Sequence, residues 1–398
     1  MNKKLIALAI AGAFAAPVAM ADNSNVVIYG EFAGSLDYVD GGSYTTGVVA
    51  PIQGISNAAA ERRGRVSSNN SFLGFKGTED LGNGWSAIWQ YEQSIAIDQQ
   101  NIGDSSTGVT GGSNQSRRQT FVGLSSKQIG SLTLGIHDTP FKTSTGPLDI
   151  FGQHTLADYR SLWGAAGSLG SVASIRAQNS AMYTSPDLSG FTIKALGAAT
   201  NENGNNAGAL GLPASSVQNP HYYSVSGTYA NGPLFATLAY EDNKTVGGAT
   251  TDLNYKNWRT GVGYSFAGFK VGLAFERIKA SGQAVSVSNE VRRNAWYLPV
   301  SYQMGNNTIK AAYTQAGKSN QRVGGVDVSG NDGAKQYSVG FDHAMSKRTN
   351  VYALYTKVRN DNNGTYSLGG GGTGIAPVTP ASIGADPQGI SVGMVHKF

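Results

Sequence analysis

The sequence predicts an all-β protein, a transmembrane antiparallel β-barrel of 16 strands. Three observations predict it: apolar and polar residues alternate along the chain, short turns alternate with long loops, and the last strand ends on an aromatic residue. The chain has 398 residues, with 54 glycines, 19 tyrosines and no cysteine, so disulfides do not close the fold. Its formal net charge of +5, to which Lys3 and Lys4 contribute two, is too small to indicate a nucleic-acid partner.

Residues 1–21 have the features of a cleaved signal peptide. Lys3 and Lys4 precede an apolar run at 5–16, and the Ala-Met-Ala of residues 19–21 provides the small residues of a cleavage site. An amino-terminal membrane anchor is the alternative, but the apolar run is much shorter than the roughly 20 residues that span a bilayer. We therefore expect an exported protein whose barrel domain comprises residues 22–398.

Period-two patterns run through the rest of the chain. Alternate side chains of a strand lie on opposite faces, so each pattern gives one apolar and one polar face. Charges and glycines on the polar faces predict a watery lumen, whereas the apolar faces predict contact with lipid. Clear examples are residues 26–38, 85–92, 258–266, 269–276 and 337–342. Aromatic residues near strand ends fit interfacial girdles: Tyr38, Trp85, Tyr91, Tyr240, Trp258, Trp296 and Tyr302.

The connections between these strands alternate strictly in length. Short turns rich in Gly, Asn and Pro lie at 80–84, 126–130, 186–190, 230–233, 266–268, 305–307 and 346–350. Longer polar tracts lie at about 40–70, 94–116, 139–175, 199–220, 242–256, 279–293, 316–334 and 358–388. These connections join 16 strands and place both chain ends on the short-turn side. Barrels with short periplasmic turns and long extracellular loops have this layout, and a barrel of this size encloses an aqueous channel.

The last strand, residues 389–398, has one largely apolar face. Counting back from Phe398, every second residue is Phe, His, Met, Val and Ile, and the intervening residues are small or polar. An aromatic carboxy terminus after such a strand is typical of bacterial outer-membrane barrels, so we expect Phe398 to act as an assembly signal. A soluble secreted β-sandwich is the alternative, but it would require a domain boundary that the chain does not show.

Five segments resemble one protein family in order along the chain. They are residues 25–30 (NVVIYG), 71–82 (SFLGFKGTEDLG), 118–124 with 130–135, 179–186 with 189–191, and 392–398. They are similar to segments of the trimeric general porins of Gram-negative bacteria, in the version typical of β-proteobacteria and Neisseria. The resemblance implies an outer-membrane homotrimer, surrounded by lipid and lipopolysaccharide, that lets small hydrophilic solutes and ions diffuse passively.

The resemblance also implies a pore constriction. In this family the third loop, here roughly Asp138–Ile175, folds into the barrel and sets acidic residues against arginines of the opposite wall. Arg118 and Arg176 match wall positions, and Asp149 matches the acidic segment of the loop. Asp158 and Arg160 lie further along the same loop.

Three more residues are expected in the lumen. The family usually carries arginine where this chain has Phe72, on the same strand face as Lys76. Glu31 adds a possible lumenal acid on the first strand. These departures leave the choice between anions and cations open, and they also allow a substrate-selective channel with an aromatic wall.

Other functions remain alternatives. A barrel that serves as an adhesin or structural surface protein would suit the long loop at 358–388. A catalytic barrel would need a serine–histidine pair or an acidic–histidine dyad, and the five histidines are scattered without paired spacing. We therefore expect no enzyme activity, no metal and no cofactor. The basic cluster at 61–65 could bind lipopolysaccharide phosphates, face the pore mouth, or be an ordinary solvated loop.

Overall fold

The computed structural model describes residues 25–42, 62–98, 117–164, 175–198, 221–246, 252–282, 290–323, 326–369 and 383–398. The predicted signal peptide lies outside these ranges, as do parts of the long loops. No helix of the described ranges is long and apolar enough to cross a membrane.

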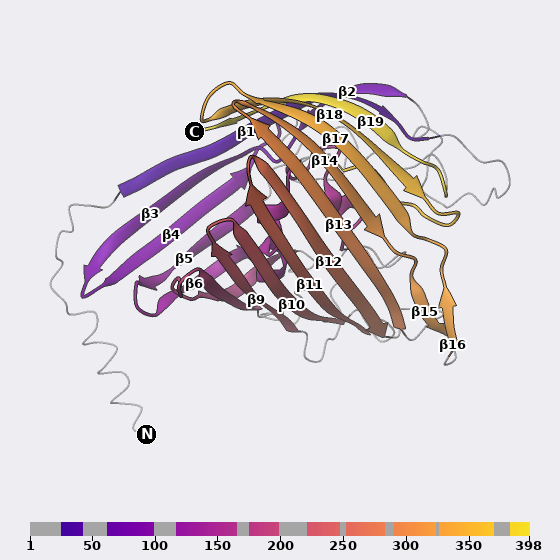
Figure 1. The fold of residues 1–398 in the computed structure, drawn as a ribbon. Coiled ribbons are helices and arrows are strands. Elements are labelled where there is room, and N and C mark those ends of the chain that lie inside the picture. Colours follow the sequence, from indigo (N-terminus) through magenta and orange to yellow (C-terminus); the bar gives the residue numbers. More distant parts are fainter. Residues whose placement is uncertain are drawn as a thin grey trace, which may run out of the picture.

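One antiparallel sheet of 19 strands closes on itself, and Figure 1 shows it as a ring of tilted strands. The first strand pairs with β3 on one side and with the last strand on the other. The first ten strands are β1 (Asn25–Asp40), β2 (Arg63–Ser68), β3 (Phe72–Gly82), β4 (Trp85–Ser94), β5 (Arg117–Ser126), β6 (Gly130–Asp138), β7 (Arg176–Thr184), β8 (Phe191–Ala198), β9 (His221–Asn231) and β10 (Leu234–Val246). The others are β11 (Asp252–Phe266), β12 (Phe269–Gly282), β13 (Glu290–Met304), β14 (Asn307–Ala316), β15 (Asn320–Val323), β16 (Val326–Ser329), β17 (Ala334–Ala344), β18 (Thr349–Asn360) and β19 (Gln388–Lys397).

These 19 strands make a barrel of 16, as the sequence predicts. β3 pairs with the first half of β1 and β2 with its second half, so together they form one spanning strand. This strand is interrupted at residues 69–71, where Asn70 has a φ of 64°. β15 and β16 form a hairpin in the loop between β14 and β17, beyond the end of the barrel in Figure 1.

All seven predicted short turns join neighbouring strands. In the turn at 266–268, Ala267 and Gly268 both have positive φ, 46° and 83°, as a two-residue hairpin turn of this type requires. Two predicted long loops are mostly strand instead. The predicted loop at 242–256 is shortened by β10 and β11, and the one at 279–293 by β12 and β13. Beyond the membrane both faces of a strand contact polar surroundings, so the apolar alternation disappears although the pairing continues.

The predicted faces of the strands are confirmed. On β1, Leu36 and Tyr38 are 67% and 55% exposed, whereas Asp37 and Val39 are 5% and 1% exposed. A strand with one apolar face outward and one mixed face inward has this alternation. The lumen is therefore lined by the polar, small and charged set.

Residues 139–164 lie against the inner wall of the barrel, and Figure 1 shows this magenta segment inside the ring of strands. They contain the short helices α2 (Pro140–Thr143), η3 (Gly146–Leu148) and η4 (Tyr159–Ser161). Leu148 packs against Gly261 and Gly263 of β11 and Gly272 of β12. A Cβ at these glycines would lie within 3.0 Å of a Leu148 methyl, so only glycine leaves room for the loop at this depth.

The largest apolar cluster also lies inside the barrel. Leu156, Tyr159 and Trp163 of the loop are at most 2% exposed, and Tyr159 stacks on the wall residue Tyr297 at 4.2 Å between ring centroids. Leu368, from the last long loop, belongs to the same cluster. Packing between loop and wall therefore narrows the lumen on this side.

The carboxy terminus takes part in closing the barrel. The Phe398 carbonyl accepts a hydrogen bond from the Gly30 N–H at 3.1 Å, and the Phe398 N–H donates to the Gly30 carbonyl at 3.2 Å. The Phe398 ring stacks on Phe32 at 5.6 Å between centroids and covers Gly30, where a Cβ would lie 2.6 Å from the ring. The last residue therefore joins the first strand through both its backbone and its side chain.

Phe398→Ala should lower the stability of the folded barrel because it removes this ring pair while keeping the backbone bonds. We expect a loss of about 1 kcal/mol from the ring contact, plus the lost apolar area. Urea titration of the refolded protein in lipid measures it. Phe341→Ala is the matched control, because Phe341 is also exposed, at 43%, and has no ring partner in the described residues. Equal losses for the two variants would contradict the role of Phe398.

Candidate functional site

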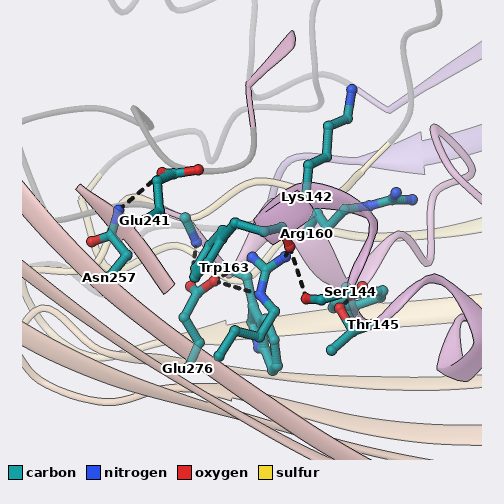
Figure 2. A network of polar contacts seen from close by, with 12 residues as sticks. Lys142, Ser144, Thr145, Arg160, Trp163, Glu241, Asn257 and Glu276 are labelled. Atoms are coloured by element: carbon teal, nitrogen blue, oxygen red, sulfur yellow. Dashed lines mark hydrogen bonds and ion pairs between the residues drawn. The ribbon is translucent and has the colours of Figure 1, made fainter. Parts of the chain in front are cut away.

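A buried ion pair of the wall holds the third loop in place. Arg259 of β11 is 1% exposed and pairs with Glu276 of β12. Its guanidinium donates to the Phe141 carbonyl at 2.9 Å and lies between the rings of Phe141 and Trp163, at 4.2 and 5.2 Å from their centroids. The Glu276 carboxylate accepts from the Gly164 N–H at 2.7 Å. Figure 2 shows this network, through which one ion pair fixes the start and the end of the described loop segment.

A second group of wall residues, on β9–β11, lies at the start of the loop. Glu241 of β10 is fully buried and accepts hydrogen bonds from the Tyr222 hydroxyl and from the Asn257 side chain, the latter at 3.2 Å and drawn in Figure 2. The Ser224 hydroxyl accepts from the Phe141 N–H at 2.9 Å. The start of the loop is therefore attached to β9 as well as to β11.

The predicted loop residues Asp149, Asp158 and Arg160 lie together. Arg160 pairs with Asp149 at 3.0 Å and with Asp158 at 2.8 Å. Backbone N–H groups of Gly152 and His154 donate to Asp149 and Asp158, respectively. Burial raises the pKa of Asp149, whereas Arg160 holds the pKa of Asp158 below its usual range against the effect of burial. The two acids are thus partnered inside the loop. Their part in a constriction stays a prediction.

Arg118 lies over Phe72 on the inner wall. Its guanidinium is 4.5 Å from the centre of the Phe72 ring, pairs with Glu92 at 3.4 Å and donates to the Asn70 side chain at 2.6 Å. The Tyr29 hydroxyl donates to the same Glu92 carboxylate at 2.8 Å. Phe72 therefore carries no charge itself but supports the arginine beside it.

A β-bulge explains why Arg118 reaches these inward residues. Val122 of the same strand is 60% exposed on the outer face, and strict alternation would place Arg118 on that face too. The register between β4 and β5 shifts between Tyr91 and Gln93, where β5 contains one residue more than β4. Such a bulge re-aims the side chains next to it.

Arg176 lies at the root of the loop and shares an acid with Lys142. Asp138, the last residue of β6, pairs with Arg176 at 3.0 Å and with Lys142 at 2.7 Å. Burial lowers the pKa of Lys142, and Asp138 opposes that effect. Together with Arg118 and Glu92, this group sets three cations against two carboxylates.

The other two predicted residues line separate parts of the lumen. Lys76 is exposed, lies 4.9 Å from the Tyr29 ring centre, and lines a cavity of about 470 Å³ with Gln90 and Phe121. Glu31 pairs with Lys397 across the β1–β19 seam at 3.5 Å. It lines a second cavity, of about 420 Å³, whose other members include Asp149, Phe151, Lys310 and Asp342.

The sequence analysis named none of five residues as part of the site: Lys142, Glu92, Asp138, Arg259 and Glu276. Strand alternation did predict that Arg259 and Glu276 face the lumen, because they alternate with the outward Trp258 and Phe275, but it gave no sign that they pair or hold the loop. Lys142 lies in a loop, where no periodicity exists to place it. Among the described residues, no three His, Asp or Glu side chains gather as metal ligands would.

Comparisons with known proteins agree on one family. A profile described as Gram-negative porin matches residues 7–363. Outer membrane porin protein 32 of Delftia acidovorans is 28% identical over 404 residues, covering 100% of both chains. Major outer membrane protein P.IB of Neisseria meningitidis serogroup B is 29% identical, covering 88% of this chain and 91% of that protein.

Solved structures show the same fold. The anion-selective porin from Comamonas acidovorans matches with a TM-score of 0.70 and 22% identity, over 94% of this chain and all of that one. The trimer form of OmpT from Vibrio cholerae matches with a TM-score of 0.63 and 13% identity, over 94% of this chain and 99% of that one. OmpF of Salmonella typhi, in complex with daunomycin, matches with a TM-score of 0.61 and 16% identity, over 95% and 98%.

Arg259→Leu should release the loop because it leaves Glu276 buried without its cation. Breaking a buried pair costs about 3–5 kcal/mol, whereas replacing both partners with apolar residues costs much less. We therefore expect a large drop in urea resistance and noisy, enlarged single-channel currents for Arg259→Leu, with stability largely restored in Arg259→Leu/Glu276→Leu. A double variant as unstable as the single one would contradict the ion pair as the main anchor.

The pH dependence of ion selectivity should depend on Asp149. Since the pKa of Asp149 is raised and that of Asp158 is lowered, acidification should neutralise Asp149 first, above the usual aspartate value of about 3.9. The loop then loses one negative charge, and the reversal potential in a KCl gradient should move toward anions as the pH falls from 7 toward the usual aspartate value. Asp149→Asn lacks that charge already and should show a smaller shift. An equal shift in both proteins would assign the titration to another group.

Proposed function

The chain belongs to the Gram-negative porin family, and we propose that its channel passes small hydrophilic solutes and ions with a preference for anions. As an outer-membrane porin it forms a water-filled channel through which solutes diffuse down their gradient. The observation that carries the preference is the group of three cations, Arg118, Arg176 and Lys142, which meets only two carboxylates.

The position of the loop limits where solutes pass. Its contacts with the inner wall run from β9 to β19: the Phe141 N–H donates to the Ser224 hydroxyl, Leu148 packs on Gly261, and Leu156 packs on Gly389. A cavity of about 420 Å³ remains between the loop and β1, β14 and β17–β19, whereas the cavity of about 470 Å³ on β3–β5, beside Lys76 and Gln90, is lined by wall residues alone. The solute path therefore runs between the loop and the wall formed by β2–β8.

Charges on both sides of this path favour anions. Arg118 projects from the wall and Lys142 from the loop, while the loop acids Asp149 and Asp158 are buried against Arg160. A narrow passage with low-dielectric walls strengthens the field of such charges and raises the local concentration of the opposite ion. The similar fold of the anion-selective porin from Comamonas acidovorans supports the same preference.

Two further features are part of the proposal. We propose a homotrimer, which the family and the trimeric form of OmpT support. The family and the fold are those of a channel rather than an enzyme. His137, the most buried histidine, lies between the Thr133 and Ser180 hydroxyls at 2.9 and 2.8 Å, an arrangement that suits a structural role.

Arg118→Gln/Arg176→Gln should move the reversal potential of the channel toward cations. The two changes leave one cation, Lys142 of the loop, against the two carboxylates Glu92 and Asp138, so the field of the passage changes sign. Bilayer recording across a tenfold KCl gradient measures the shift. Lys127→Gln/Lys347→Gln removes the same charge from exposed short turns and should change it little. Equal shifts in both double variants would overturn the assignment of the passage.

A further inference from the structure

Basic residues gather on the outer face of the barrel at its long-loop end. We call Lys256 of β11, Arg277 and Lys279 of β12, Arg292 of β13 and Lys318 after β14 the basic rim. On these strands the outward set is fixed by exposed residues such as Trp258, at 49%, and the inward set by buried ones such as Ile278, at 2%. Arg277 and Lys279 flank Ile278 and therefore point outward.

The basic rim begins where an aromatic belt ends. Trp258 lies opposite Arg277 in the strand register and packs against Tyr240 at 4.5 Å between ring centroids. Phe275, the preceding outward residue of β12, packs against Trp296 at 4.6 Å. Tyr and Trp rings mark the level where a bilayer meets water, so the rim lies at the level of the lipid headgroups. Long loops extend from extracellular barrel ends, which places this level in the outer leaflet.

The rim carries more positive charge than its acids neutralise. Lys279 and Arg292 both pair with the Glu290 carboxylate, and the Lys279 ammonium lies 2.6 Å from it. Lys256 is 3.8 Å from Asp242. Arg277 and Lys318 form no ion pair within the described ranges. Five cations thus meet two carboxylates, so the rim carries a net positive charge that attracts anions.

A cavity lies within the rim. It has a volume of about 160 Å³, and four cations outnumber one carboxylate in its lining, which consists of Arg277, Arg292, Arg293, Lys318, Glu290, Asn294, Gly317 and Asn320. The Gly317 N–H donates to the Asn294 carbonyl at 2.8 Å, which fixes the chain before Lys318 against β13. Since a water molecule occupies about 30 Å³ of liquid, the cavity has room for a phosphate group. Amide and guanidinium groups on its walls are donors that suit phosphate oxygens.

We propose that the basic rim binds a phosphate of lipopolysaccharide, the phosphorylated glycolipid of the outer leaflet. The inference rests on the outer-membrane location of the porin. Headgroup-level basic pockets recognise anionic lipids in this way. A neighbouring subunit is the other candidate occupant, but unpaired lysine is depleted in the core of protein interfaces.

The basic cluster at 61–65, which the sequence analysis considered as a binding site for lipopolysaccharide phosphates, includes an arginine that faces the lumen. Arg65 pairs with Asp37, which is 5% exposed, at 3.1 Å. Asp37 alternates with the outward Leu36 and Tyr38, so Arg65 belongs to the inward set. This residue therefore borders the lumen, and it is β11–β14 that present cations to the lipid.

Arg277→Gln/Lys318→Gln tests the proposal. The delipidated oligomer in detergent is titrated with lipopolysaccharide, and bound lipid is counted by native mass spectrometry. We expect the double variant to bind at least about tenfold more weakly than the unaltered protein, because each cation near the surface contributes about 1 kcal/mol. Lys127→Gln/Lys347→Gln, with the same charge change at the short-turn end, should bind as the unaltered protein does.

Further arms separate the possible ligands. Enzymatically dephosphorylated lipopolysaccharide should bind the unaltered protein as weakly as intact lipopolysaccharide binds the double variant, and millimolar inorganic phosphate should not displace the lipid. Undiminished binding by the double variant, undiminished binding of dephosphorylated lipid, or full displacement by inorganic phosphate would each overturn the proposal.

Folding and assembly are checked on the same samples. The double variant should keep the oligomeric state and the conductance of the unaltered protein, because neither residue lies on the solute path. Dissociation of the oligomer would assign the rim to a subunit contact instead. Loss of lipid binding by the double variant with unchanged conductance supports the rim as the lipid site. A missing channel in the unaltered protein would refute the proposed function and leave the lipid measurement valid.

Discussion

Closure of the sheet is the constraint on which the rest of the structure depends. In lipid, a backbone N–H or C=O without a partner costs several kcal/mol, so an open sheet edge is not tolerated. Here β1 meets β19 along Glu31 to Asp40, and Phe398 completes the seam on Gly30. Once the sheet is closed, period-two alternation separates a lipid face from a lumen face. Charged side chains such as Arg259 can then be buried, provided that a partner lies on a neighbouring strand.

The Arg259–Glu276 pair holds the loop against one side of a wide barrel and so confines the passage to the other side. A buried pair is a weak source of stability, but its unused donors and acceptors can specify one position for a neighbouring segment. Here the Arg259 guanidinium donates to the Phe141 carbonyl, and the Glu276 carboxylate accepts from the Gly164 N–H, so the loop packs on one side of the lumen. The opposite side carries the wall cations Arg118 and Arg176. Anion preference is in this view a consequence of where the loop is attached, as much as of which charges the chain contains.

Much of this architecture could be predicted from the sequence because it follows from repeated local patterns. The short turns have characteristic residues, and Leu36 and Asp37 show their faces by alternation alone. Arg118 could not be placed in this way, since a bulge that no local pattern marks reverses its face. The partners of Asp149 and Lys142 depend on how the loop folds, and contacts between segments far apart in the chain leave no periodic signal. The resemblance to porins indicated which residues to examine, but not which ion pairs they form.

The most direct test asks whether solutes pass on the side of the lumen that the loop leaves open. The chain contains no cysteine, so each introduced thiol is unique. Gln90→Cys places a thiol on the open wall, and Ser338→Cys places one on the inner wall where the loop covers it, next to Gln336, which bonds the Leu156 carbonyl. A charged thiol reagent is added during bilayer recording of each variant. The structure predicts stepwise loss of current for Gln90→Cys and none for Ser338→Cys. Equal block of both variants, or block of Ser338→Cys alone, would contradict the position of the passage.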